Sequence, residues 1–324
     1  MNDAVPALAP LAAASRPGRA PRERKRASPN RVLPDAPLVA AEAPDSIKER
    51  SKLTKEEWRE YTKTVWQIAN TSHAGHPAVF PPEIPRRLVK LFTFVEETVL
   101  DPFGGTGTTA AVALDLGRRS ISVEQNNSYI EHIQNATKGK GAPGWNTIVH
   151  GDSRRLAIPD ESVGLVVTSP PYWNKADYGD GKANVGNVAG YRAFFEEIRP
   201  VFEECYRCLM PGRKLCVVTA NVNQHTDHGL LTFPLAADFT VLLRDLGFVL
   251  VNELVWNKDG TGGRWGSSGE QRPIFGSYPY PPNFLFKNVH EYILVFAKPP
   301  SRVVRGPKVQ SYAALMESPT AEAK

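Results

Sequence analysis

The hexapeptide TSPPYW, at residues 168–173, places several chemically useful groups directly after the apolar run VGLVV. A serine hydroxyl and a prolyl carbonyl can both accept hydrogen bonds, and the two aromatic rings can stack on a flat ligand. The prolines lack an amide hydrogen and hold the segment extended and rigid. The alternative is a proline-rich loop that merely ends a strand. The candidate catalytic residues are Ser169, Pro170, Pro171 and Tyr172, and Trp173 is a candidate for contact with substrate.

A second stretch, DPFGGTGTT at 101–109, follows a short apolar strand and opens a helix rich in Ala, Val and Leu. Glycines there allow close approach of the backbone to a ligand, and the helix start offers free amide groups. The stretch lacks the lysine of a P-loop and does not fit G-x-G-x-x-G. We therefore expect a nucleotide-type cofactor site. Its candidate residues are Asp101, Phe103, Gly104, Gly105, Gly107 and Thr108.

The elements that must hold these groups are strands and helices in alternation, which indicates a mostly parallel sheet. After the first strand, we expect strands at 119–124, 147–152, 165–169 and 214–220, with helices at about 127–137 and 191–209. Glu124 ends the second strand about twenty residues after the glycines, where a ribose-binding carboxylate belongs in a doubly wound fold. Asp152 ends the third. Ligands bind beyond the carboxyl ends of parallel strands, so all these motifs should meet at one edge of the sheet.

Two segments precede the glycine-rich strand. From Ser51, a capping-box pattern leads into Trp58, Tyr61, Val65 and Trp66 at helical spacing, which predicts a helix that packs on the domain or covers its pocket. Prolines between His76 and Pro85 then stand where a second amphipathic helix, ending near Phe92, could begin, with none inside it.

Together, the 101–109 and 168–173 stretches resemble the amino-group DNA methyltransferases, which methylate an exocyclic nitrogen of cytosine or adenine. The resemblance extends from about His76 to Pro299. It implies a Rossmann-like α/β fold with a seven-stranded, mostly parallel sheet and a C-terminal antiparallel hairpin, here matched by 251–256 and 290–296. It also implies S-adenosyl-L-methionine as cofactor and double-stranded DNA as partner. The cofactor motif precedes the catalytic motif, whereas many members run in the opposite order, so the chain looks circularly permuted.

The resemblance also implies a mechanism. An exocyclic amine is a poor nucleophile until acceptors draw on its protons, and Ser169 with the carbonyl of Pro170 would supply them. Tyr172, together with Trp173, would stack on a base that has left the duplex. Serine in the first position of the motif favours cytosine N4 over adenine N6. Competing interpretations are an RNA or protein-glutamine methyltransferase, and a silent DNA-binding protein of the same fold.

Two loops are candidates for target recognition, because they interleave basic and aromatic residues that suit phosphate contact and base stacking. They span 174–190 and 257–288, and the latter lies between the two hairpin strands. The alternative is that both loops simply fold over the pocket. The substrate-binding candidates in these loops are Lys175, Arg264, Trp265 and Arg272.

Composition divides the chain of 324 residues into a basic, Pro- and Ala-rich disordered tail at 1–46, a catalytic domain at 47–300 and a flexible tail at 301–324. The net charge of +5 suits a polyanionic partner without requiring one. We find neither a membrane-length apolar run nor a secretory signal, and so expect a cytoplasmic, nucleoid-associated prokaryotic protein. Three cysteines, Cys205, Cys208 and Cys216, fit a reducing compartment rather than a zinc site. A cognate restriction endonuclease is a further suggested partner, and the sequence does not decide between monomer and dimer.

Overall fold

The computed structural model describes residues 45–70, 80–173, 184–258, 279–280, 286, 288–301 and 311–316. The predictions for almost all of the N-terminal tail, for most of the two recognition loops and for most of the C-terminal tail lie outside these residues. The same holds for Lys175, Arg264, Trp265 and Arg272.

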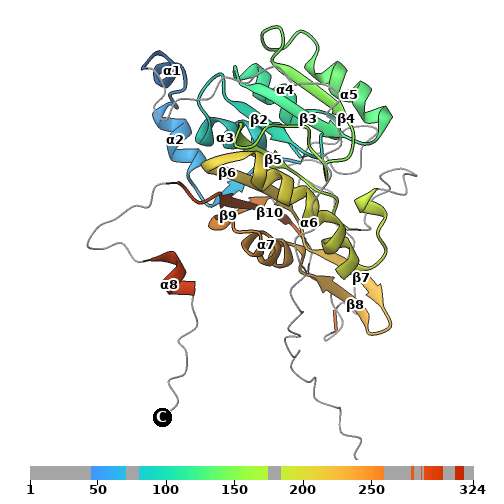
Figure 1. The fold of residues 1–324 in the computed structure, drawn as a ribbon. Helices are drawn as coiled ribbons and strands as arrows, with labels where there is room; N and C mark the ends of the chain where they lie inside the picture. Colours follow the sequence, from blue (N-terminus) through green and yellow to red (C-terminus); the bar gives the residue numbers. More distant parts are fainter. Residues whose placement is uncertain are drawn as a thin grey trace, which may run out of the picture. The chain divides into compact units, whose positions relative to one another are not determined.

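The expected seven strands form one mixed sheet (Figure 1). The strands are β2 (Thr98–Asp101), β3 (Arg119–Glu124), β4 (Asn146–His150), β5 (Val163–Thr168), β6 (Leu209–Thr219), β9 (Val249–Asn257) and β10 (His290–Ala297). β2 pairs in parallel with β3 on one side and with β5 on the other, β3 with β4, and β5 with β6. β10 then runs antiparallel to both β6 and β9, which confirms the predicted hairpin.

An eighth strand replaces part of a predicted helix. The capping box is present at Thr54 and Glu57, but helix α2 (Lys55–Tyr61) ends early and Val65–Gln67 forms β1, parallel to β9 at the sheet edge. Trp66 is fully buried there and Trp58 is exposed. The prediction of one helix that carries all four apolar residues is therefore wrong, because pairing with β9 and burial of Trp66 outweigh the local helical spacing.

Successive side chains along the central strands point to opposite faces of the sheet and pack into two hydrophobic clusters. Val166 and Leu215 belong to the cluster that includes α6 (Tyr191–Cys208) and α7 (Leu235–Asp245). Their neighbours Val167 and Cys216 belong to the cluster that includes α3 (Glu83–Phe92) and α4 (Thr108–Asp115). α5 (Asn127–Thr137) packs beside α4. A sheet buried on both faces explains why its central strands are continuously apolar.

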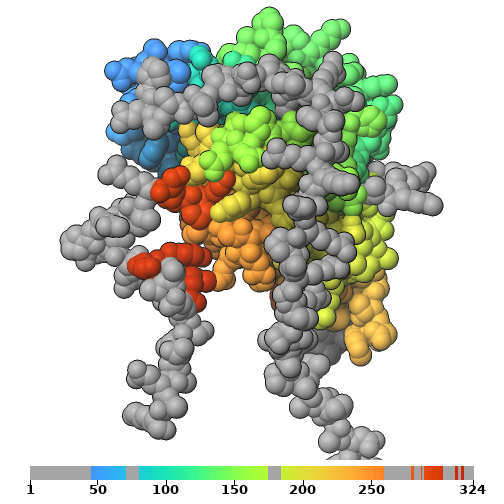
Figure 2. All heavy atoms as spheres, viewed as in Figure 1, coloured from blue at the N-terminus to red at the C-terminus, as the bar shows by residue number. Residues whose placement is uncertain are grey.

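The remaining elements are short or decorate the sheet. A two-stranded hairpin of β7 (Val222–Thr226) and β8 (Gly229–Phe233), which we did not predict, reaches the surface next to α6 (Figure 2). Pro85 lies in the first turn of α3, contrary to the expectation that the helix contains no proline. The other elements are α1 (Asp45–Arg50), the 3-10 helix η1 (Val185–Asn187) and α8 (Tyr312–Met316).

Within the described ranges, no helix has the length and apolar character needed to cross a membrane.

Candidate active site

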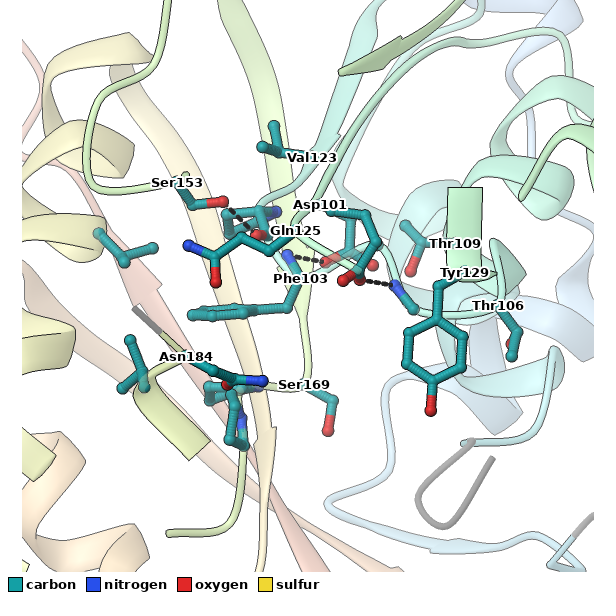
Figure 3. A pocket seen from close by; sticks show the side chains of 18 of the residues that line it. Asp101, Phe103, Thr106, Thr109, Val123, Gln125, Tyr129, Ser153, Ser169 and Asn184 are labelled. Atoms are coloured by element: carbon teal, nitrogen blue, oxygen red, sulfur yellow. Dashed lines mark hydrogen bonds between the residues drawn. The ribbon is translucent and has the colours of Figure 1, made fainter. Parts of the chain in front are cut away.

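A pocket opens at the carboxyl edge of the parallel strands, where the sequence motifs were expected to meet. Figure 3 shows Asp101, Phe103, Ser169 and Asn184 grouped around it, with Tyr129 beside them. The predicted residues on its wall are Asp101, Phe103, Gly104, Gly105, Thr108, Glu124, Asp152, Ser169, Pro170 and Pro171. The structure therefore brings most of the predicted cofactor residues and three of the predicted catalytic residues into one cavity.

Asp101 is the buried centre of this wall. Its Oδ1 accepts a hydrogen bond from the hydroxyl of Thr168 at 2.8 Å and one from the amide of Phe103 at 3.1 Å. Only 3% of the residue is exposed. Burial disfavours the charged form and raises the pKa of Asp101 to about 7, even though both hydrogen bonds favour ionisation. The carboxyl group therefore changes its charge near neutral pH.

The glycine-rich loop is shaped by contacts on its far side. Gly107 caps α4 with φ of +84°, and a Cβ built there would lie 2.9 Å from the Cα of Ile133 in α5. Gly104 is also closely packed, since a Cβ there would lie 3.0 Å from Cδ1 of Ile133 and that side chain would have to shift slightly. Gly107 is not part of the pocket wall, so its role is to let α5 pack against the loop rather than to contact a ligand.

Glu124 holds this loop from the end of β3. Its two carboxylate oxygens accept the amides of Gly105 and Asn126, each at 2.8 Å. Burial raises the pKa of Glu124, and the amide hydrogen bonds oppose that effect. The acidic residue predicted to bind ribose thus lines the pocket and also fixes the backbone of the loop.

Asp152 lies on the pocket wall beyond β4, in a different electrostatic setting. Burial works against its ionisation, but hydrogen bonds from Arg154 outweigh that effect and keep the pKa of Asp152 below its ordinary value. The hydroxyl of the next residue, Ser153, donates to the carbonyl of Pro102. This contact ties the loop after β4 to the glycine-rich loop.

The Ser-Pro-Pro-Tyr turn begins where β5 ends. Ser169, Pro170 and Pro171 line the pocket, whereas Tyr172 is partly buried and packs against the α6 and α7 core. The hydroxyl of Tyr172 lies 3.3 Å from Oγ of Ser169 and donates to Oε2 of Glu291 at 2.7 Å. Tyr172 is therefore anchored beside the pocket by its hydroxyl.

Trp173 is not available for stacking on a substrate. Its φ of +53° turns the side chain into the core, where the residue is only 5% exposed. The ring packs against Tyr191 and Phe233, and its Nε1 donates to the carbonyl of Ala189. The structure does not support the expectation that Trp173 contacts substrate, because its ring is part of a packed aromatic cluster.

Several wall residues did not stand out in the sequence. Phe80 was part of the noted proline-rich segment, and Asn184 and Val185, at the start of η1, fall in the candidate recognition loop 174–190. Tyr129 in α5 carried no motif. Their contribution depends on how α5 and η1 pack, and residue spacing does not encode that packing. The others are Pro102, Thr106, Thr109, Val123, Gln125, Ser153 and Val201.

The three cysteines have no role in this pocket. All three are buried free thiols, and burial raises the pKa of Cys208 to about 12. No group of three or more His, Cys, Asp or Glu residues suited to a metal ion occurs among the residues that the structure describes.

Comparison with known proteins identifies the family. The model of the N6_N4_Mtase family, described as DNA methylase, matches residues 25–135 and 163–322. The type II methyltransferase M.MjaI of Methanocaldococcus jannaschii is 42% identical over 86 residues, which cover 25% of this chain and 28% of that protein. The type II methyltransferase M.BglI of Bacillus subtilis is 40% identical over 89 residues, covering 27% and 26%. The matched segment thus spans about a quarter of the length of these curated relatives.

Among solved structures, TTHA0409 of Thermus thermophilus, determined in complex with S-adenosyl-L-methionine, is 34% identical with a TM-score of 0.35, over 48% of this chain and 57% of that one. The family match itself covers more than half of the present chain and includes both the glycine-rich loop and the Ser-Pro-Pro-Tyr turn. The chain therefore belongs to the N6_N4_Mtase family of DNA methylases.

Proposed function

We propose that the protein is an S-adenosyl-L-methionine-dependent DNA methyltransferase that modifies the exocyclic amino group of a base, with N4 of cytosine favoured over N6 of adenine. One observation carries the proposal: the Ser-Pro-Pro-Tyr turn and the glycine-rich loop line the same pocket. The bond from Thr168 to Asp101 joins the two motifs directly.

The wall of the pocket suits this cofactor. An apolar slot lined by Phe103 and Val123 matches an adenine ring, and Glu124 at the end of β3 matches the ribose hydroxyls. Asp101 and the first amides of α4 offer both an acceptor and donors for an amino-acid end. When bound, S-adenosyl-L-methionine supplies an electrophilic methyl group.

The chain's own contribution is to make the amine nucleophilic. The lone pair of an exocyclic amine is delocalised into its ring. When Oγ of Ser169 and the carbonyl oxygen of Pro170 each accept an amine hydrogen, they favour a tetrahedral nitrogen whose lone pair is free to react. Formation of the bond from nitrogen to the methyl carbon would accompany cleavage of the methyl–sulfur bond, with the neutral thioether as leaving group, and the nitrogen would then lose one proton to solvent. No covalent enzyme intermediate is required, in keeping with three buried thiols that have no place in the pocket.

The substrate must reach the turn as a single unpaired base. An amino group inside a duplex is inaccessible to a side chain at the bottom of a pocket, so the base has to leave the stack. The ring of Tyr172 would stack on the extruded base while its hydroxyl stays anchored. The match to DNA methylases favours DNA as the polymer, and the serine in the first position of the turn favours cytosine.

The deciding experiment supplies purified protein with radiolabelled S-adenosyl-L-methionine and unmethylated duplex DNA, RNA or protein. Mass spectrometry of the digested nucleosides then separates N4-methylcytosine from N6-methyladenine. We expect label in DNA as N4-methylcytosine, and loss of at least about a hundredfold in turnover for Ser169→Ala. Detection of N6-methyladenine instead would show that adenine is the target base. Label confined to RNA or protein, or cofactor-independent binding of DNA without turnover, would refute the proposed function.

A further inference from the structure

A chain of polar contacts leads from the catalytic turn across the sheet to the C-terminal hairpin. Oγ of Ser169 contacts the hydroxyl of Tyr172 at 3.3 Å, and that hydroxyl contacts Glu291 at 2.7 Å. Glu291, the second residue of β10, also forms an ion pair with Lys258, which directly follows β9. Tyr172 and Glu291 are 119 positions apart in the sequence.

Sheet topology explains how these groups meet. β10 is antiparallel to β6, so the start of β10 lies at the same edge as the carboxyl ends of β5 and β6. β9 ends at that edge too, where the amide of Lys258 donates to the carbonyl of Val289 at 2.8 Å. Glu291 therefore faces the catalytic turn from the base of the hairpin.

The ion pair is well sheltered. The side chains of Lys258 and Glu291 are 14% and 13% exposed, and the Lys258 ammonium lies 4.4 Å from the centre of the Trp256 ring. A carboxylate that pairs with an ammonium accepts hydrogen bonds and has none to donate.

The direction of each hydrogen bond then follows from the number of protons available. The hydroxyl of Tyr172 has one proton and gives it to Glu291, so it can only accept from Ser169. The proton of Ser169 is then directed away from the pocket, and its lone pairs remain to accept from the substrate amine. The distance of 3.3 Å is long for a hydroxyl pair, as is common before a substrate tightens such contacts.

We propose that Glu291 is a positioning residue for methyl transfer: through Tyr172 it fixes Ser169 as a hydrogen-bond acceptor toward the substrate amine. The inference rests on the proposed function and adds two residues to it, Glu291 as the anchor of the relay and Lys258 as its ion-pair partner. It also gives Tyr172 a role for its hydroxyl that is separate from stacking by its ring.

The first test separates the role of the Tyr172 hydroxyl from that of its ring. Tyr172→Phe keeps the aromatic face and removes the relay, so kcat should fall about tenfold, the effect of one hydrogen bond, while KM for DNA stays within about twofold. Glu291→Ala should give the same loss in kcat. Glu291→Gln keeps one acceptor oxygen and should retain more activity than Glu291→Ala. Calorimetry should show unchanged cofactor affinity in all three.

A double-mutant comparison excludes a merely structural role. In a Ser169→Ala background, measured under single-turnover conditions, Tyr172→Phe and Glu291→Gln should cause no further loss, because the hydroxyl that they orient is gone. A general loosening of the site would lower the rate in both backgrounds. Tyr206→Phe and Glu161→Gln serve as matched controls, since Tyr206 packs on Phe248 and Glu161 pairs with Lys298, away from the pocket wall.

The outcomes are distinguishable. Active wild-type protein with a Tyr172→Phe variant of unchanged kcat would overturn the relay and leave the proposed function standing. Equal losses in the native and Ser169→Ala backgrounds would also overturn it. Wild-type protein without methyl transfer to DNA would overturn the proposed function and the relay together.

Discussion

The hydroxyl of Thr168 donates to the carboxylate of Asp101 across 2.8 Å, although 67 positions separate the two residues. They are the last residues of two adjacent parallel strands, β5 and β2, whose register pairs Leu100 with Val166. Because Thr168 immediately precedes Ser169, this bond couples the loop that begins at Asp101 to the Ser-Pro-Pro-Tyr turn. It also brings a buried carboxylate, whose charge changes near neutral pH, next to the candidate chemistry.

Asp101 should make stability fall as pH rises. Its pKa is about 7 when folded against an ordinary 3.8, so between those values the folded protein holds a proton that the unfolded chain has lost. The free energy of unfolding therefore decreases through that window, by an upper limit of about 4 kcal/mol. Asp101→Asn, which mimics the protonated form, should remove this slope. Its melting temperature should exceed that of wild type at pH 8 and match it near pH 4.

The control for this prediction is Thr168→Val, which keeps the volume of the side chain and removes a donor to the ionised carboxylate. The pKa of Asp101 should therefore rise further in this variant. The free energy of unfolding should continue to fall with pH beyond the value at which that of wild type levels off. Thermal unfolding from pH 4 to 9 without cofactor measures all three proteins. An Asp101→Asn variant with the same pH slope as wild type would show that other groups cause it.

Gly107→Ala should be more destabilising than an ordinary left-handed glycine substitution. Gly107 and Gly117 have φ of +84° and +72°, so alanine meets similar backbone strain at both, about 1–2 kcal/mol. Only at Gly107 would the new Cβ press on backbone, 2.9 Å from Cα of Ile133; at Gly117 the nearest atom is 3.9 Å away. Urea unfolding should show a clearly larger loss for Gly107→Ala, and similar losses for both would contradict this reading of the loop.

Tyr172 and Trp173 are adjacent, yet their replacement by alanine should have opposite consequences. Trp173→Ala empties a packed aromatic site and should cost about 3–5 kcal/mol of stability. Tyr172→Ala removes a partly buried ring beside the pocket and should abolish most methyl transfer with a smaller change in stability. Chemical denaturation and the DNA assay, run in parallel, would reveal any reversal of this pattern.

Glu124→Gln should weaken cofactor binding about tenfold or more. The carboxylate accepts two amides, from Gly105 and Asn126, and a glutamine has only one acceptor oxygen. In the variant, one of these two amide groups would lose its hydrogen bond to residue 124. Calorimetric titration with S-adenosyl-L-methionine measures the effect, and Asp115→Asn, which alters an exposed ion pair with Lys140, is the matched control. An affinity equal to that of wild type would show that Glu124 neither binds ribose nor holds the loop.

Local patterns were sufficient for much of the fold. The strand 119–124 and the helix 127–137 were predicted with the bounds that the structure gives to β3 and α5. Each had clear ends and an unambiguous period. The order of strands placed Asp101, Glu124, Asp152 and Ser169 at one edge, and all four line the pocket.

Prediction failed where distant segments decide the outcome. Trp66 has helical spacing from Trp58, but its strand exists because it pairs with Trp256, far along the chain. Trp173 lies in the core, unlike its neighbour Tyr172, because its backbone adopts a positive φ. A non-glycine residue rarely adopts that conformation, and packing of the ring in the core stabilises it here. Glu291 carries no motif at all, and only the antiparallel course of β10 brings it to Tyr172.

The buried thiols have a practical consequence for experiments on this protein. Cys205, Cys208 and Cys216 are its only cysteines, all are enclosed in the core, and burial raises the pKa of each. Protonated, inaccessible thiols react slowly with maleimides. A single cysteine introduced at an exposed site such as Val251 on β9 would therefore be labelled selectively in the native chain. A fluorophore there could report on DNA encounter without first removing the natural cysteines.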